Sequence, residues 1–120
     1  MSLLLTLAVM LPAPSLPPCQ KAECHAWRAC NNGSTSACIR RAALKYRVSE
    51  PMLRRKAWCE SRMNPGAYNR GSGASGLFQF LPSTWRTTPY RWRSVWRAKW
   101  NALAAGWMHR AGRGGEWACR

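Results

Sequence analysis

The chain has 120 residues, a mass of 13.6 kDa and a formal net charge of +15. Its 47% hydrophobic and 11% aromatic residues disfavour a disordered, collagen-like or coiled-coil protein and predict one compact domain. The 19 Lys and Arg residues against four acidic ones indicate a polyanionic partner, and six cysteines favour an exported protein stapled by disulfides.

The first 18 residues precede the predicted domain. Residues 1–11 form an apolar run about as long as the hydrophobic part of a signal peptide and too short to span a membrane as a helix. Residues 12–18 hold four of the eight prolines and predict an extended spacer. We therefore expect export, with a frayed or buried terminal segment as the alternative.

Residues 19–37 form a cysteine-rich lead-in to the domain. Turn-forming residues fill positions 31–36, which predicts a loop-rich segment stapled by disulfides. The spacing leaves three pairings open among Cys19, Cys24, Cys30 and Cys38. Zinc bound by these thiolates and His25 is the alternative, but the segment lacks a Cys-x-x-Cys pair and export favours oxidation, so we expect no metal.

Residues 38–120 form the predicted domain, which is mainly α. Helical spacing begins near Ser36, and a second helix capped by Ser49 should run to about Met63. A glycine-rich loop follows at 71–76. A short helix from Pro82 and a longer one from 95 to 110, capped by Ser94 and ended by Gly112, complete the predicted elements.

Glu60 is the strongest candidate for acid–base chemistry in this domain. The chain has no Asp, and Glu23, Glu50 and Glu116 fall in the lead-in, in a first helical turn and in the glycine-rich tail. Glu60 shares the apolar stripe of its helix, so burial should raise its pKa more than exposed arginines lower it. A half-buried Glu paired with Arg62 or another Arg is the structural alternative.

Two motifs carry a family resemblance. The stretch 60–65, ESRMNP, followed by 73–85, GASGLFQFLPSTW, resembles the signature of lysozyme-like lytic transglycosylases of the SLT and resuscitation-promoting-factor type. Asn101 and Ala102 are similar to the family's third motif, Tyr-Asn-Ala, although Trp100 replaces the Tyr and can only donate a hydrogen bond. The resemblance covers about residues 38–119 and implies a small lysozyme-like helical domain with a glycine-rich active-site loop and disulfide staples.

The resemblance also implies an activity. Such enzymes cleave the β-1,4 bond between N-acetylmuramic acid and N-acetylglucosamine in peptidoglycan, using one Glu as general acid and then base, without a cofactor. Glu60 would take that role, and the lack of a convincing second carboxylate agrees with it. Hydrolysis of the same bond, as in a muramidase, stays open.

The resemblance implies further site residues. Gln79 and Asn101 would bind N-acetyl or hydroxyl groups of the glycan, and aromatic rings would stack on its sugars, although amides often brace loops and aromatics often fill cores. Related actinobacterial wall hydrolases also imply a disulfide between Cys59 and Cys119. The full set of expected substrate-binding residues is Tyr68, Asn69, Ser75, Phe78, Gln79, Trp100 and Asn101.

The segment 85–100 is rich in Trp and Arg and, taken alone, would indicate a cationic membrane-active peptide. Within an enzyme, its tryptophans would fill the core and its basic residues would attract anionic wall polymers or a membrane surface. We expect no nucleic acid, because no helix-turn-helix, zinc-finger or RNP pattern is present. The expected protein is a monomer, secreted, wall-associated or delivered by a phage, and a non-catalytic cationic wall- or membrane-binding protein is the alternative.

Overall fold

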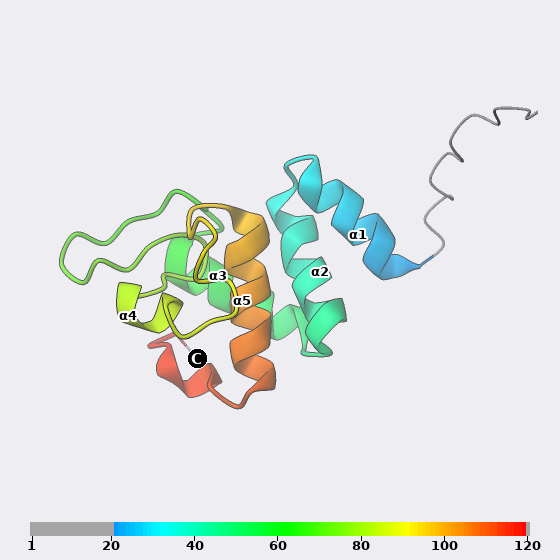
Figure 1. The fold of residues 1–120 in the computed structure, drawn as a ribbon. Coiled ribbons are helices and arrows are strands. Elements are labelled where there is room, and N and C mark those ends of the chain that lie inside the picture. Colours follow the sequence, from blue (N-terminus) through cyan, green and yellow to red (C-terminus); the bar gives the residue numbers. More distant parts are fainter. Residues whose placement is uncertain (1–20, 120) are drawn as a thin grey trace, which may run out of the picture.

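The computed structural model describes residues 21–119, so the apolar run, the proline-rich spacer and Cys19 lie outside the described residues. Figure 1 shows the arrangement of the helices. They are α1 (Ala22–Asn31), α2 (Thr35–Tyr46), α3 (Glu50–Ser61), α4 (Pro82–Trp85), α5 (Ala98–Arg110) and the 3₁₀ turn η1 (Gly114–Glu116). Within residues 21–119 there are isolated β-bridges but no strand, which confirms the mainly α fold class.

Helices α2 and α5 lie side by side at the centre of the molecule (Figure 1). Gly106 lets them approach closely, since a Cβ at that position would lie 3.0 Å from Cδ2 of Tyr46 and 3.1 Å from the carbonyl oxygen of Ala42. Small residues on both helices pack against larger apolar side chains from the rest of the chain. The fully buried members of this core include Ile39, Ala42, Leu53, Ala57, Leu77, Phe78, Ala102, Ala105 and Met108.

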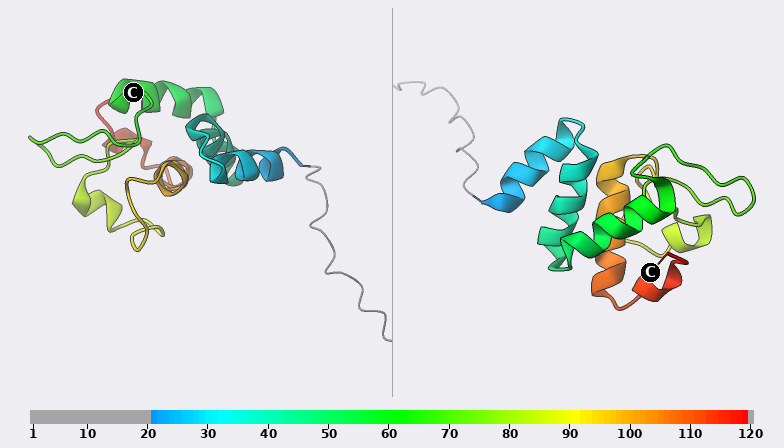
Figure 2. Two further views of the ribbon diagram at one scale, coloured as in Figure 1. Left: turned by 90° about the horizontal axis from the view of Figure 1, so that it is seen from above. Right: turned by 180° about the vertical axis from the view of Figure 1, so that it is seen from behind.

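Helix α3 crosses α5, behind it in Figure 1 and in front of it in the right view of Figure 2. Ser49 caps it as predicted, because its Oγ accepts a hydrogen bond of 3.2 Å from the backbone N–H of Met52. The helix ends at Ser61, two residues before the predicted end. Arg62 and Met63 adopt left-handed backbone angles, with φ of 54° and 63°, and turn the chain away from the helix axis.

The lead-in is more regular than predicted. Residues 22–31 form a full helix, α1, rather than loops, since Ala26 and Cys30 recur at helical spacing and are buried, and the helix packs against α2. A disulfide between Cys30 and Cys38 joins the two helices with an S–S distance of 1.98 Å. Cys24 is disulfide-bonded as well, so these cysteines are oxidised rather than thiolate ligands of zinc.

The last long helix, α5, begins at Ala98 and not at Val95. The carbonyl oxygen of Val95 accepts a hydrogen bond of 2.8 Å from Nδ2 of Asn101, which takes the place of a helical partner. Residues 94–97 therefore form a turn. The predicted short helix at Pro82 and the stop at Gly112, whose φ is 77°, are both present.

The segment between α3 and α4 and the segment after α5 frame the end of α3. Figure 2 shows the long loop after α3 extending away from the helices, and the chain after α5 returning toward α3. Trp117 anchors this returning tail, because it is buried and its indole Nε1 donates a hydrogen bond of 2.7 Å to the carbonyl oxygen of Phe78. In residues 21–119, no helix has the length and apolar character needed to cross a membrane.

Candidate active site

Glu60 lies in the last turn of α3, where the apolar stripe of the helix reaches the surface. Leu53 and Ala57 are fully buried on that stripe, and the Glu60 side chain is half-buried one turn further on. The sequence pattern therefore places a carboxyl group at the edge of the core, as predicted. The expected alternative, an ion pair with Arg62, is not formed, because Arg62 lies over the ring of Trp58 instead, 5.3 Å from its centroid.

The end of the chain covers Glu60. Cys59 and Cys119 are joined by a disulfide with an S–S distance of 2.08 Å, which confirms the pairing that the family resemblance implied. This bond brings the backbone N–H of Cys119 to Oε1 of Glu60, at a donor–acceptor distance of 3.2 Å. A residue 59 positions away in sequence thus supplies the hydrogen bond to the candidate acid.

The environment raises the pKa of Glu60 above its usual value. Burial is the largest cause, because a charged carboxylate loses water at this position. The Cys119 N–H and the positive charge of Lys56 act in the opposite direction and lower the pKa. Glu60 also lies at the carboxyl end of α3, where the helix dipole disfavours a negative charge. The protonated form is therefore favoured to a higher pH than in an exposed Glu.

A cluster that the sequence analysis missed fixes the tail beside this acid. Nζ of Lys56, one turn before Glu60, donates a hydrogen bond of 2.6 Å to the carbonyl oxygen of Gly114 and lies 3.0 Å from Nε2 of His109. The His109 ring stacks on Trp117 at a centroid distance of 5.1 Å. Burial and the charge of Lys56 lower the pKa of His109 to about 4, so this imidazole is neutral at neutral pH.

Lys56 was missed because helical spacing places it beside the apolar stripe, where a lysine is normally expected to be solvated. The spacing of Lys56 and Glu60, four residues apart on one helix, is the signal that could have indicated it.

Ser61 ties the end of α3 to the following loop. Its Oγ lies 2.7 Å from the carbonyl oxygen of Leu77 and 3.0 Å from that of Ala57, and accepts a hydrogen bond of 3.2 Å from the backbone N–H of Asn64. Glu60 therefore neighbours the stretch 73–80 in space as well as in the motif pattern.

Gln79 uses the nitrogen of its side-chain amide for hydrogen bonds within the protein, but not the oxygen. It adopts a left-handed backbone angle, φ 51°, and its Nε2 donates hydrogen bonds of 3.0 Å to the carbonyl oxygens of Ala67 and Gly76. Its Oε1 makes no hydrogen bond with any residue of 21–119. Gln79 is thus a loop brace that still offers an acceptor to a ligand.

Three expected ligand-binding polar residues serve the protein itself. Asn69 closes the tip of the loop, because its Oδ1 accepts hydrogen bonds from the backbone N–H groups of Gly71 and Ser72. Ser75 is buried, and its Oγ donates to the carbonyl oxygen of Gly73 across 3.0 Å. The structure therefore does not present Ser75 freely to a glycan, whereas the exposed Asn69 has only its Oδ1 engaged within residues 21–119.

Asn101 is the third of these polar residues, and the structure contradicts the expectation that it binds the glycan. It is fully buried, its Oδ1 accepts a hydrogen bond of 2.8 Å from the backbone N–H of Phe78, and its Nδ2 donates to the carbonyl oxygens of Val95 and Ser75. Both polar atoms of the Asn101 amide are hydrogen-bonded to backbone groups, so Asn101 joins α5 to the loop and is not a glycan ligand.

The aromatic residues that were expected to stack on sugars also differ in their exposure. Phe78 is fully buried and packs edge-on against Trp117, so it cannot stack on a sugar, and that expectation is wrong. Trp100 is partly buried against Tyr90. Tyr68 is 57% exposed and meets Trp96 in an edge arrangement at 5.9 Å between centroids, which leaves a ring face accessible.

Comparison with known protein families agrees with this geometry. The sequence model of the transglycosylase SLT domain matches residues 37–105, which run from α2 through α3 and the loop into α5. The match contains Glu60, Gln79 and Asn101 and excludes α1 and the tail with Cys119. No curated protein and no solved structure matches the chain significantly. Because the family match spans more than half of its length, the chain belongs to the transglycosylase SLT domain family, whose lytic activity cleaves glycosidic bonds of peptidoglycan.

Proposed function

We propose that this chain is a peptidoglycan lytic transglycosylase in which Glu60 acts alone, first as general acid and then as general base. The observation that carries the proposal is the setting of Glu60, half-buried at the end of α3 with a raised pKa and a backbone N–H as its hydrogen-bond donor. A raised pKa keeps the proton on a carboxyl group to higher pH, and a protonated carboxyl group can donate that proton to a leaving oxygen.

The proposed reaction needs no second carboxylate. Protonated Glu60 gives its proton to the oxygen that joins C1 of N-acetylmuramic acid to C4 of N-acetylglucosamine, and the C1–O bond breaks. The Glu60 carboxylate then removes the proton from the C6 hydroxyl of the same muramic acid, whose oxygen bonds to C1. The product is a 1,6-anhydro ring, the proton is back on Glu60, and no water has been consumed.

The Cys119 N–H suits both halves of this cycle. When Glu60 has lost its proton, the N–H donates to the carboxylate and stabilises its negative charge. Because burial outweighs this hydrogen bond, the Glu60 carboxylate is a stronger base than an exposed one, which favours the return of a proton from the C6 hydroxyl.

The other carboxyl groups support a single-acid mechanism over a two-carboxylate hydrolase. Glu50 forms a salt bridge with Arg54 at 3.1 Å, Glu116 pairs with Arg113, and Glu23 is exposed on α1. Hydrolysing glycosidases generally place a second carboxylate across the scissile bond to activate water or attack the sugar. The chain has four glutamates and no aspartate, and the three besides Glu60 are ion-paired or exposed on α1.

The substrate contacts that we propose are fewer than the sequence suggested. Tyr68 offers an exposed ring for a sugar face, and Oε1 of Gln79 offers an acceptor for an N-acetyl N–H or a hydroxyl. We further propose that the protein acts at the cell wall, where its substrate lies, after export through the segment 1–18 or delivery by a phage.

Mass spectrometry of the products of purified peptidoglycan tests the mechanism. Wild-type protein should release muropeptides with 1,6-anhydro ends, which are lighter by one water than hydrolysed ones. Glu60→Gln keeps the size of the side chain and removes the proton donor, and should lower the rate by about 10²–10⁴-fold. Glu50→Gln is the matched control, since it makes the same charge change at the other end of α3 and should retain activity.

Other outcomes would replace the proposal. Hydrated reducing ends formed by the wild type would identify a muramidase that uses a positioned water. Wall clearance that survives Glu60→Gln would show that the cationic surface, rather than catalysis, is responsible.

A further inference from the structure

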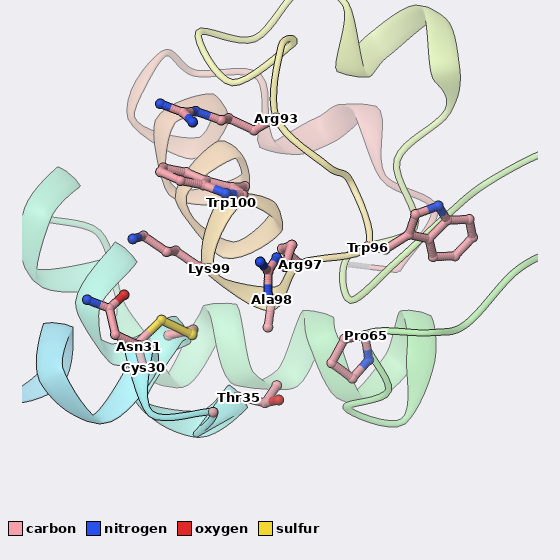
Figure 3. A pocket seen from close by; sticks show the side chains of 12 residues that line it. Cys30, Asn31, Thr35, Pro65, Arg93, Trp96, Arg97, Ala98, Lys99 and Trp100 are labelled. Carbon is pink, nitrogen blue, oxygen red and sulfur yellow. A yellow bond between two sulfur atoms is a disulfide. The ribbon is translucent and has the colours of Figure 1, made fainter.

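A groove separate from Glu60 lies at the start of α5. Its volume is about 560 Å³, within the range of ligand sites. Figure 3 shows it between the first turn of α5, the turn from α1 to α2, and Pro65 in the loop after α3. Glu60, Gln79 and the tail do not contribute to its lining, so the groove is not the site described above.

Among the described residues, three positive side chains and no acidic one line this groove. Arg93, Arg97 and Lys99 are the cations, with Trp96 and Trp100 beside them. Among residues 21–119 no salt bridge joins these cations to a glutamate, because Glu50 and Glu116 pair with other arginines and Glu60 accepts from Cys119. Glu23 lies on α1, where its charge acts on Arg41. The counter-charge of the groove must therefore come from outside the protein.

Trp100 holds two of the cations in place. The guanidinium of Arg93 lies 4.7 Å from the centroid of the Trp100 ring and Nζ of Lys99 lies 4.6 Å from it. Figure 3 shows Arg93, Trp100 and Lys99 as successive layers, with Arg97 pointing into the middle of the groove. Cation–π contacts of this kind restrict long side chains, which lowers the entropy cost of binding a ligand.

The charges in this region also repel one another. Burial lowers the pKa of Lys99 first, and the positive charges of Arg41, Arg93 and Arg97 lower it further. An anion in the groove would relieve this repulsion, so the electrostatics favour a negatively charged occupant.

We propose that the groove binds the phosphodiester groups of an anionic wall polymer, a polyol phosphate of the teichoic acid type. Two guanidinium groups offer paired N–H donors that match phosphate oxygens, and Lys99 adds a point charge. The choice of a wall polymer rests on the proposed function, which places the enzyme where such polymers occur. Binding there would retain the enzyme on the wall while Glu60 acts on neighbouring glycan strands.

The aromatic residues favour this ligand over a nucleic acid. Single-stranded nucleic acids are usually held by bases that stack on free aromatic faces. The Trp100 ring is in contact with Arg93, Lys99 and Tyr90, so it is not free to stack on a base. Of the aromatic residues that line the groove, this leaves Trp96, which is 45% exposed, as a stacking platform. A chain of phosphates separated by small polyols needs the charges and not the stacking.

Isothermal titration with lipid-free poly(glycerol phosphate) tests the proposal. The groove variant combines Arg93→Gln, Arg97→Gln and Lys99→Gln. The control variant combines Arg55→Gln, Arg86→Gln and Arg110→Gln, which are exposed and lie outside the groove, so both proteins lose three positive charges. We expect the groove variant to bind at least tenfold more weakly than wild type and the control variant to change less than about twofold.

Each other result has a defined meaning. Equal weakening of both variants would overturn the proposal in favour of non-specific attraction by net charge. Single-stranded DNA or poly-glutamate of equal charge that binds as tightly at the same salt concentration, with the same dependence on the groove residues, would overturn the assignment to phosphodiester polymers of the wall.

Circular dichroism and turnover of peptidoglycan stripped of teichoic acid test the fold and activity of the groove variant, and both should match those of wild type. Glu60→Gln should bind poly(glycerol phosphate) like wild type. Loss of turnover in that variant therefore reports on the proposed reaction, and loss of polymer binding in the groove variant reports on the groove.

Discussion

Cys119 donates its backbone N–H to Oε1 of Glu60 across 3.2 Å, while its sulfur is bonded to that of Cys59, the residue before Glu60. The disulfide therefore fixes the distance between the candidate acid and its hydrogen-bond donor. The same bond closes the longest loop among the described disulfides, with a sequence separation of 60. Stability and activity are linked through this single covalent contact.

Removing the Cys59–Cys119 disulfide should lower both the stability and the activity of the protein. Cys59→Ser with Cys119→Ser should lower the free energy of unfolding by about 4 kcal/mol, the value that loop entropy gives for a loop of this length. Turnover of peptidoglycan should fall, because the tail no longer covers Glu60. Urea denaturation and a turnover assay measure the two effects.

The Cys30–Cys38 disulfide provides the control. It closes a loop with a sequence separation of 8, so Cys30→Ser with Cys38→Ser should cost about 2–3 kcal/mol and leave turnover intact once the protein is folded. Equal loss of turnover in both double variants would contradict a special role for the tail at Glu60.

Glu60→Gln should stabilise the protein at neutral pH. Burial raises the pKa of Glu60 in the folded state, so between the unfolded and folded pKa values the native state binds more protons, and stability falls as pH rises through this range. Gln carries no charge and avoids this loss. The gain should be small, because the carboxyl group is only half-buried, and it should disappear in acid, where Glu60 is protonated in both states.

Urea denaturation at several pH values measures this difference. A variant that is equally stable or less stable than wild type at neutral pH would show that ionised Glu60 is well accommodated. The raised pKa would then have no energetic basis.

His109 should make the protein sensitive to mild acid. Its pKa is lowered to about 4 in the folded state, against 6.5 for the free side chain. As pH falls from about 6.5 to 4, the unfolded chain takes up a proton that the folded protein does not, so stability is lost across this window. The loss is at most about 1.4 kcal/mol per pH unit and is reduced by partial exposure of the ring.

His109→Phe keeps a ring against Trp117 and removes the titrating group. Thermal unfolding of this variant should change less between pH 6.5 and 4 than that of wild type. His25→Phe is the control, because His25 is exposed on α1. An unaltered acid sensitivity in His109→Phe would assign the effect to other groups.

Gly76→Ala should destabilise the fold strongly. A Cβ at this position would lie 2.3 Å from Nδ2 of Asn101 and 2.5 Å from the carbonyl oxygen of Val95, and the φ of 82° strains any L residue. Displacing Asn101 would leave the N–H of Phe78 and the carbonyl oxygen of Val95 without their hydrogen-bond partner. Each unpaired group should cost about 1–3 kcal/mol of stability. Gly115→Ala, where a Cβ meets no atom within 4 Å, should be close to neutral in the same thermal unfolding experiment.

Local sequence signals predicted local structure well in this chain. The Ser49 cap, the stripe of Leu53 and Ala57, and the stop at Gly112 each depend on neighbours within a few residues, and each is present. The helix in the lead-in was missed because turn formers and closely spaced cysteines resemble a stapled loop. There the burial of Ala26 and Cys30 against α2 outweighs the local preference.

Long-range contacts decided the side-chain roles that sequence could not predict. Asn101 matched a family motif and was expected at the ligand, but its amide is fully used by backbone groups of residues 75, 78 and 95. Gln79 resembles it in chemistry yet keeps one acceptor free. Which amide faces solvent depends on how the loop folds over α5, and no spacing rule contains that information.

Lys56 gives the most direct test of the electrostatics at Glu60. Its positive charge lowers the pKa of Glu60, against the larger effect of burial. Lys56→Met keeps the apolar stem, removes the charge and should raise the Glu60 pKa. Because the reaction starts from protonated Glu60, the decline of kcat/KM at high pH should move to higher pH.

Lys56→Met should also cost about 1–3 kcal/mol of stability, since the carbonyl oxygen of Gly114 loses its donor. Lys56→Arg keeps the charge and should return the pH profile toward that of wild type even where packing suffers. Lys45→Met removes the same charge from an exposed site on α2 and should leave the profile unchanged. A profile that shifts equally in Lys45→Met and Lys56→Met would reflect net charge, whereas a shift confined to Lys56→Met would identify Glu60 as the group that titrates in catalysis.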